Sequence, residues 1–342
     1  MKSYIKAKLI LFKKKLLLLC SFNIFFTKLY FFIFSNSYNH EQRAVMNGIR
    51  QFRLSTEKQK TSIALLRRNI HRLEKGLIMR PRKEVFATSF IFQTVELFKI
   101  LASEAGKSIQ VLDWSYSVLS EYFSVVDINE ATIRKSFELF RHLDYKADKK
   151  GLSVFPYAKK SNSVSYKELL SLANNRNSVR WFVTNSAPCE CDVSKAVELA
   201  LKAPSACNRQ SFEYIFITET ELLMKVLSLA GGTVGFREGI PSLMVVVGDY
   251  SGYLLERDRH LIYIDSSLAT MQLLLAFETL AYNSCVLNWP ESDINNYRVN
   301  KLLNLPSYKK VIMLIAVGKG EQGGGIPFSQ KKTSNDSLSV YR

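Results

Sequence analysis

The sequence predicts a chain of two parts, a helical N-terminal region and a second region in which helices alternate with short strands. Residues 41–150 contain a single proline and three glycines, and their apolar residues recur at helical spacing. From residue 168 onward, short apolar runs rich in β-branched residues lie beside glycine or proline, as buried strands usually do. The 342 residues are 47% hydrophobic and include 22 Phe and 16 Tyr, which is ample for a packed core and excludes disorder as the main character of the chain.

The positive charge of the chain is concentrated near its N-terminus. The formal net charge is +17, but residues 1–83 carry 19 basic and 3 acidic residues, whereas the rest carry 28 basic and 27 acidic. Because a nearly neutral body has no basic surplus to neutralise phosphates, we expect no nucleic-acid partner. A nucleic-acid binder that uses residues 1–83 alone is a weaker alternative to a membrane or polyanion surface.

Residues 1–35 combine six early lysines with an apolar stretch over residues 16–34. This stretch just reaches the roughly 20 residues that a bilayer requires, but Lys28 would cost about 3 kcal/mol near the bilayer centre. A span held with its lysines in the cytoplasm would export the rest of the chain, and no small-x-small cleavage site follows. We favour an anchor on the inner face of the membrane; a spanning helix, a signal peptide and a helix packed on the body or on a second copy are the alternatives.

The helical region and its linker cover residues 36–160, with helix breaks expected near Gly76–Pro81 and near Gly106. The run 67–76 is unusually basic for a helix that also carries an apolar stripe. It is either a solvated helix face or a cationic patch that faces phosphate, lipid head groups or an acidic substrate.

A linker over residues 146–167, rich in Gly, Pro, Ser and Lys, leads into the second region, residues 168–335. The expected strands of this region lie at 215–218, 243–248 and 311–317. The expected helices lie at about 192–203, 219–230 and 264–282.

The five cysteines are few, odd in number and unevenly spaced, which indicates reduced thiols in a cytoplasmic protein. Cys189 and Cys191 could begin a metal site, but no second pair of Cys or His stands at ligand spacing. We therefore expect small buried residues at both positions and no metal.

Three polar clusters interrupt the core pattern of the second region. In the first, Arg176 and Arg180 flank Ser178, so two planar cations and a hydroxyl fall within five residues. This combination suits a phosphate and a flat ring rich in acceptors, because Arg donates hydrogen bonds in a planar, bidentate way.

The other two clusters carry amides and an aromatic residue. A turn between an expected helix and an expected strand offers convergent donors and acceptors with little reason to be in a core, from Pro204, Ser205, Asn208 and Gln210. The third cluster is Asn288–Trp289, where an amide and an aromatic end a strand.

The order of these motifs resembles the flavin-dependent nitroreductase family. Arg-x-Ser-x-Arg-x-Phe at 176–182 is followed by Ala-Pro-Ser-Ala-x-Asn-x-Gln at 203–210, and segments at 265–272, 287–289 and 315–318 continue the order. The resemblance covers about residues 170–335, and it implies an α+β fold with a central, mostly antiparallel sheet flanked by helices. The segment 71–77 is similar to a subgroup found in surface-polysaccharide gene clusters.

The resemblance also implies FMN bound at the interface of a homodimer. Arg176 and Ser178 would hold the FMN phosphate, and Arg180 would face the pyrimidine edge of the ring. Pro204, Ser205, Asn208 and Gln210, with Asn288 and Trp289, would complete the cofactor site. NAD(P)H would reduce FMN at N5 and leave before a small acceptor enters, and no catalytic side-chain acid or base is expected.

Three departures from the family pattern concern individual contacts. Asn177 stands where a second Arg is common, and Ser211 stands where Pro is usual. The cation expected near the C-terminus has no clean match, and Lys319, Lys331 and Lys332 are its candidates.

The sequence therefore predicts an FMN-dependent NAD(P)H oxidoreductase acting on an unidentified small acceptor, with a role in polysaccharide biosynthesis. The alternative is a non-catalytic or flavin-binding accessory protein of a membrane-associated polysaccharide assembly.

Overall fold

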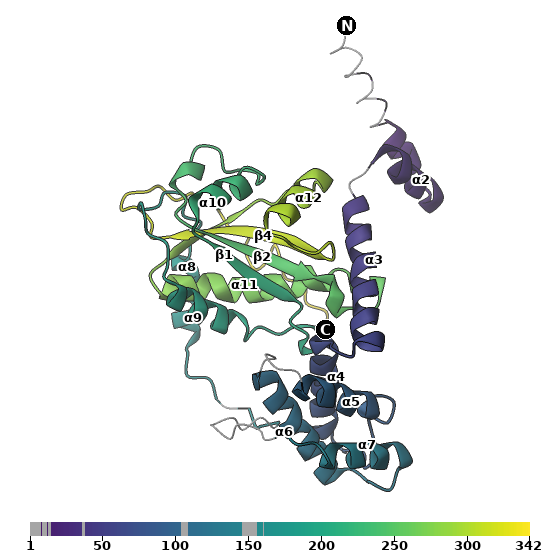
Figure 1. Cartoon of the computed structure of the whole chain (residues 1–342). Coiled ribbons are helices and arrows are strands. Elements are labelled where there is room, and N and C mark those ends of the chain that lie inside the picture. Colours follow the sequence, from purple (N-terminus) through teal and green to yellow (C-terminus); the bar gives the residue numbers. More distant parts are fainter. Residues whose placement is uncertain are drawn as a thin grey trace.

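The protein is described by a computed structural model that covers residues 8, 12, 15–35, 38–103, 109–145, 156–159 and 161–342. Half of the expected linker and the first two lysines of the N-terminal segment, Lys2 and Lys6, lie outside these residues. A helical part and a part built on a sheet are both visible in Figure 1, as the sequence predicts.

The helical part consists of a projecting helix, a connecting helix and a bundle. Helix α2 (Ile24–Phe34) has no buried residue and projects away from the body in Figure 1. Helix α3 (Asn39–Arg53) continues through a π-helical turn at Leu54–Lys58. The bundle follows as α4 (Ile63–Leu77), α5 (Ile91–Ser103), α6 (Ile109–Val125) and α7 (Ala131–Arg141).

The bundle has an apolar core of its own. Ile70, Phe98, Leu119 and Ile133, one from each helix, are fully buried in this core. The apolar spacing in the sequence therefore does predict buried helix faces, and α4 ends at Leu77, beside the expected break.

The sheet has four strands in the order β1-β2-β4-β3, and every neighbouring pair is antiparallel. The strands are β1 (Phe212–Ile217), β2 (Leu243–Asp249), β3 (Asn283–Leu287) and β4 (Lys309–Gly318). The expected α+β class with a central antiparallel sheet is confirmed.

Helices cover both faces of the sheet. Alternate residues of β2 point to opposite sides: Met244 and Val246 pack with α9 (Glu190–Ala200) and α11 (Leu261–Thr279). Leu243 and Val245 pack on the other side with α10 (Thr220–Leu227) and α12 (Asp293–Leu302). A further helix, α8 (Tyr166–Asn175), leads into this part and packs beside α11.

One helical stretch in the described part, Glu256–Thr279, is long and apolar enough to cross a membrane by length and composition. Half of its most apolar window is buried inside the protein, and its C-terminal part, α11, packs against the sheet. We therefore assign it as a core helix. The shorter α2 is the other apolar helix found among the described residues.

Most of helix α3 packs against the sheet part, while Phe52 near its C-terminal end is buried in the bundle core. Ala44 and Val45 are buried with Tyr250 and Tyr253, which follow β2. At Gly48 the backbones come so close that an added Cβ would lie 2.4 Å from the Cβ of Tyr250 and 2.7 Å from its carbonyl carbon. The sequence predicts this helix as part of the helical region but does not indicate its contact with Tyr250.

The close approach at Gly48 makes a testable prediction. Gly48→Ala should lower the free energy of unfolding by about 1–3 kcal/mol, because overpacking against backbone outweighs the gain in helix propensity. Urea unfolding measures the change. The matched control is Gly239→Ala, where nothing lies within 4 Å of the added Cβ, and its effect should stay within about 0.5 kcal/mol. Equal stability of the two variants would refute the packing of α3 on Tyr250.

Candidate functional site

The first predicted cluster, which we call the arginine cluster (Arg176, Ser178 and Arg180), lies beside the start of β3. Arg176 follows the last turn of α8, and the chain then runs alongside β3, with the Val179 N–H donating to the Ser284 carbonyl at 3.1 Å. Arg180 Nη1 donates to the carbonyl of Ser178 at 3.3 Å. All three residues of the cluster are half-buried.

Neither arginine of this cluster has a carboxylate within ion-pair distance among the described residues. Burial raises the pKa of Glu278, and this shift is opposed by a hydrogen bond from Asn283 and by Arg176. Burial also raises the pKa of the Cys285 thiol, opposed by Arg180 and Arg176. The two guanidiniums thus share one small region at the start of β3 and keep donors free for an anion.

The three lysines that could supply the cation expected near the C-terminus differ in position. Lys319 follows β4, where its carbonyl accepts from the Val183 N–H at 2.8 Å and its own N–H donates to Ser186 Oγ at 2.9 Å. Its backbone is therefore held next to the segment that continues from Arg180. Lys331 and Lys332 lie in the exposed C-terminal segment.

The second predicted cluster forms a tight turn over residues 204–210, between α9 and β1. Gln210 N–H donates to Ser205 Oγ at 3.3 Å, and the Gln210 amide donates to Asn208 Oδ1 at 3.0 Å. Cys207, Asn208 and Gln210 all have φ near +53°, which is unfavourable for Cys and Gln. Three such residues within four positions are a form of backbone strain that clusters at functional sites.

Asp265 of α11 supports the 204–210 turn through hydrogen bonds. Asp265 is only 2% exposed, and its Oδ2 accepts hydrogen bonds from the Ala206 N–H at 3.0 Å and from the Tyr253 hydroxyl at 3.3 Å. Burial raises the pKa of Asp265, opposed by these two hydrogen bonds and by Arg209. The sequence placed Asp265 in the family order but did not assign it this supporting role.

Helix α4 of the bundle touches the same turn. Arg67 Nε donates to the Asn208 carbonyl at 3.0 Å, and the Arg67 guanidinium lies 5.6 Å from the ring centre of Trp114. Trp114 Nε1 in turn donates to Glu74 Oε1 at 2.8 Å, while Glu74 Oε2 lies 3.1 Å from His71 Nδ1. The basic run that the sequence singled out therefore meets the turn, and its unusual charge was the only signal of this contact.

The arginine cluster and the 204–210 turn lie at opposite ends of the sheet. Phe212, next to the turn, is level with Gly248 and Lys310, whereas Ser284, next to the arginine cluster, is level with Val317. At about 3.3 Å per residue, these levels are roughly 20 Å apart along β4. They also lie at opposite edges, beside β1 and β3, so one chain does not bring the two clusters together.

The third cluster is divided between the surface and the core. Asn288 is exposed, and its carbonyl accepts from the Gly231 N–H at 2.9 Å. Trp289 is buried, and its Nε1 donates to Asn296 Oδ1 at 3.0 Å. Packing and this hydrogen bond account for Trp289 without a ligand, so its role at a cofactor stays a prediction.

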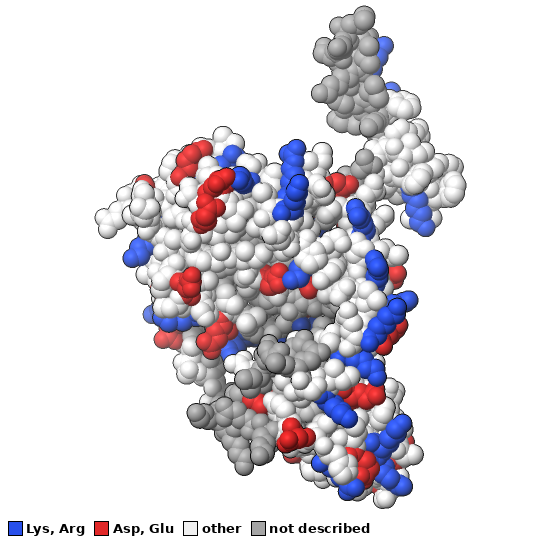
Figure 2. All heavy atoms as spheres, in the orientation of Figure 1, with Lys and Arg blue, Asp and Glu red and all other residues white. Residues whose placement is uncertain are grey.

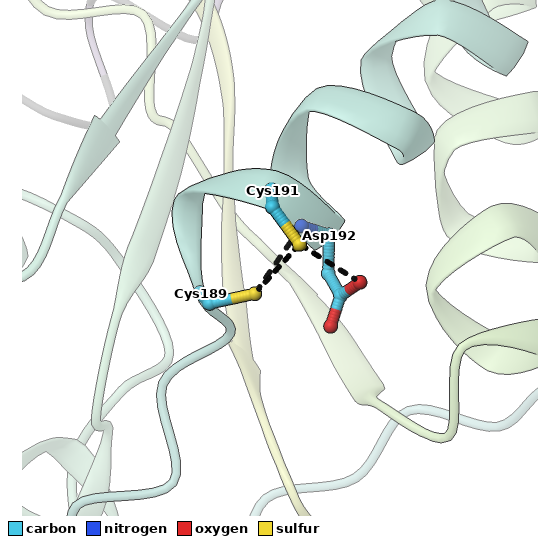
Figure 3. A group of neighbouring side chains, drawn as sticks. All are labelled: Cys189, Cys191 and Asp192. Carbon is cyan, nitrogen blue, oxygen red and sulfur yellow. Dashed lines mark hydrogen bonds between the residues drawn. The ribbon is translucent and has the colours of Figure 1, made fainter.

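Cys189 and Cys191 are exposed, so the expectation that they are buried is wrong. Figure 3 shows their sulfur atoms facing each other at the start of α9, 3.3 Å apart, with Asp192 beside them. Both oxygens of Asp192 already accept hydrogen bonds, from Lys195 at 2.9 Å and from the Tyr282 hydroxyl at 3.2 Å. The thiols are exposed because they begin a helix at the surface rather than pack beneath it.

Comparisons with known proteins find similarity over the sheet part. The Nitroreductase family model matches residues 173–235 and 229–319. Among curated proteins, YodC of Bacillus subtilis (strain 168), provisionally named an NAD(P)H nitroreductase, is 21% identical over 201 residues, 48% of this chain and 97% of YodC.

Two of the solved structures to which the chain is similar have nitroreductase names. An FMN-dependent nitroreductase from Clostridium difficile R20291 is 18% identical over 51% of this chain and 99% of its own, with a TM-score of 0.43. A nitroreductase-like protein from Streptococcus mutans is 16% identical over 52% of this chain and all of its own, with a TM-score of 0.45. The family match confirms the resemblance that the motifs predicted.

Proposed function

Since residues 173–319 form a nitroreductase-family domain, we propose that the protein is an FMN-dependent NAD(P)H oxidoreductase that reduces a small conjugated or nitro-like acceptor. The observation that carries the proposal is the arginine cluster, whose two guanidiniums converge on one region and have no carboxylate partner among the described residues. Bound FMN would supply the hydride chemistry, so the chain needs no acid–base pair.

The residues of the two clusters suit the two ends of FMN. Arg176 and Ser178 would bind the phosphate, because a planar cation and a hydroxyl offer donors to its oxygens. Arg180 would lie at the pyrimidine edge, where a fixed cation stabilises the negative charge that reduction places there. Ser205, Asn208 and Gln210 would contact the ring or the ribityl chain through a turn whose strained backbone is held by Asp265 and Arg67.

We further propose that each FMN site is built from two chains. The two clusters lie at opposite ends and edges of the sheet within one chain, and FMN is too small to bridge a separation of roughly 20 Å along the strands together with the width of the sheet. A homodimer would place the arginine cluster of one protomer beside the 204–210 turn of its partner, and would do so twice by symmetry.

Purified protein tests the proposed enzyme. It should be yellow, release FMN on denaturation, and lose its flavin absorbance band when NADH or NADPH is added without oxygen. A colourless protein that takes up no added FMN would overturn the proposal and favour the accessory-protein alternative. A role in polysaccharide biosynthesis rests only on the similarity of segment 71–77 and would follow from a polysaccharide precursor acting as the acceptor.

We also propose that α2 attaches the protein to the inner face of a membrane. Its apolar side chains are exposed, with Phe32 at 86% and Ile24 at 71%, and in Figure 2 the described surface of the projecting segment is mostly uncharged, with a few lysine side chains and no acidic ones. Such a surface is typical of an interfacial anchor, and the lysines before it would bind anionic lipid. Deleting residues 1–35 should move the protein from the membrane pellet to the soluble fraction; unchanged partitioning would contradict the anchor.

A further inference from the structure

We propose that Arg68 and Arg72 of α4 bind an anionic group, a carboxylate or a phosphate, carried by the acceptor. This inference rests on the proposed function, because it names the class of substrate that would reach the flavin beside the 204–210 turn. It also assigns to the helical N-terminal part a role in binding the acceptor.

The two arginines lie next to each other and next to the turn. They are four positions apart on one helix, so their side chains share a face of α4. The guanidinium of Arg72 lies 3.7 Å above the ring of Phe90, which fixes its plane and leaves its edge free for a ligand. Arg72 is close enough to Cys207 of the turn and to Arg68 for both to influence its pKa, which burial lowers most.

A cavity of about 460 Å³ opens between α4, the 204–210 turn and the loop before α11. Its cationic lining consists of Arg68, Arg209 and Arg257, and its acidic lining consists of Glu57 and Asp258. Phe52, Leu65 and Leu261 are among its apolar lining residues, so the cavity suits a ligand with an apolar body and an anionic end.

The arginines around the cavity form no ion pairs within the described part of the chain. No carboxylate lies within ion-pair distance of Arg68, Arg72, Arg209 or Arg257 there, and the buried Nε of Arg209 has no hydrogen-bond partner. Like charges at positions i and i+4 of a helix repel each other, and an anion bound between them would relieve that repulsion.

The neighbouring Arg67 shows by contrast what a structural arginine looks like in this helix. Its Nε donates to the Asn208 carbonyl and its guanidinium lies near Trp114, so the side chain is held by contacts within the protein. Arg67 holds the turn. Arg68 lines the cavity, and Arg72 lies one helical turn further along the same face of α4.

The test compares two acceptors of almost the same shape, 4-nitrobenzoate and neutral nitrobenzene, with the full-length FMN-loaded enzyme. In the variant Arg68→Gln/Arg72→Gln, kcat/KM for 4-nitrobenzoate should fall about 10- to 100-fold, because a charge-assisted contact is lost. For nitrobenzene it should change less than about twofold. Arg68→Lys/Arg72→Lys, which keeps both charges, should recover part of the activity toward 4-nitrobenzoate.

The matched control removes two exposed positive charges outside the cavity lining, in the variant Lys58→Gln/Lys75→Gln. It should leave the preference between the two acceptors unchanged. If it shifts the preference as much as the arginine variant does, long-range attraction rather than binding at α4 is the cause, and the proposal is wrong.

A second measurement needs no flavin. Cys207 lines the cavity and is half-buried, so its alkylation by iodoacetamide, followed by peptide mass mapping, reports on occupancy. 4-Nitrobenzoate should slow this alkylation in the wild-type protein and not in Arg68→Gln/Arg72→Gln.

The outcomes separate this inference from the proposed function. If the protein reduces neither acceptor but 4-nitrobenzoate protects Cys207 from alkylation, the proposed enzyme activity is contradicted and the anion site is supported. Reduction of both acceptors with equal sensitivity to the variant, and no protection, would overturn the anion site alone. A variant that raises KM for NADPH but not for NADH, with 4-nitrobenzoate unaffected, would assign the arginines to the donor's phosphate and refute their role with the acceptor.

Discussion

A hybrid dimer made from two flavin-free variants is expected to bind FMN at one of its two sites. One variant, Arg176→Ala/Arg180→Ala, removes the free cations near the start of β3, and the other, Ser205→Ala/Asn208→Gly, removes two polar groups of the 204–210 turn. Each variant alone should lose FMN affinity about 100-fold or more. Glycine is chosen at position 208 because it keeps the left-handed backbone found there, with φ of 53°.

The hybrid recovers one site because each chain keeps the cluster that the other has lost. Co-expression with two different tags, followed by tandem purification, isolates it, and its flavin absorbance per protein should reach about half that of the wild-type dimer. Mixing each variant with its own differently tagged copy is the control and should remain colourless. A colourless hybrid would mean that each site lies within one chain, which contradicts the opposite placement of the clusters on the sheet.

Glu291→Gln is expected to cost about 1.5–3 kcal/mol in the free energy of unfolding, because it leaves a buried ammonium without its carboxylate counter-ion. Lys310 of β4 is fully buried, and its Nζ lies 2.6 Å from Glu291 Oε2. Burial lowers the pKa of Lys310, but Tyr263 and Glu291 raise it by more, so the group is charged in the folded protein. Chemical unfolding at neutral pH measures the loss.

Two further variants show whether the buried charge is the cause. Glu221→Gln breaks an ion pair with Lys225 on the surface of α10 and should change stability by less than about 0.5 kcal/mol. Adding Lys310→Met to Glu291→Gln removes the unpaired charge and should recover part of the lost stability. No recovery would point to lost packing around Glu291 instead of an uncompensated charge.

The secondary structure of the sheet part is readable from local composition. Runs such as 243–248 and 311–317 are apolar at nearly every position because both faces of the sheet are covered, and they appear as β2 and β4 with ends shifted by no more than two residues. The strand at 215–218 begins earlier, at Phe212, since the polar Glu213 and the aromatic Tyr214 interrupt its apolar pattern. The order of polar motifs was equally readable, and it led to the family whose model matches residues 173–235 and 229–319.

The contacts between distant segments were not readable in the same way. Arg67 and Asn208 are 141 positions apart, and nothing in the spacing of either segment indicates its partner. In the sequence, Gly48 is only a residue that weakens a helix. The structure shows that Tyr250 lies too close for a side chain at this position. The exposure of Cys189 was also mispredicted, because small residues fit a core and a helix start equally well.

Local sequence alone determined the two-part plan, the sheet core and the polar motifs proposed as the cofactor site, because periodicity and side-chain chemistry are properties of a short window. Only the tertiary structure decided that the basic run of α4 meets the 204–210 turn and that the arginine cluster lies at the opposite end of the sheet. The physical reason is that a hydrophobic pattern specifies which face of an element is buried, whereas the partner of that face depends on how all the elements pack together.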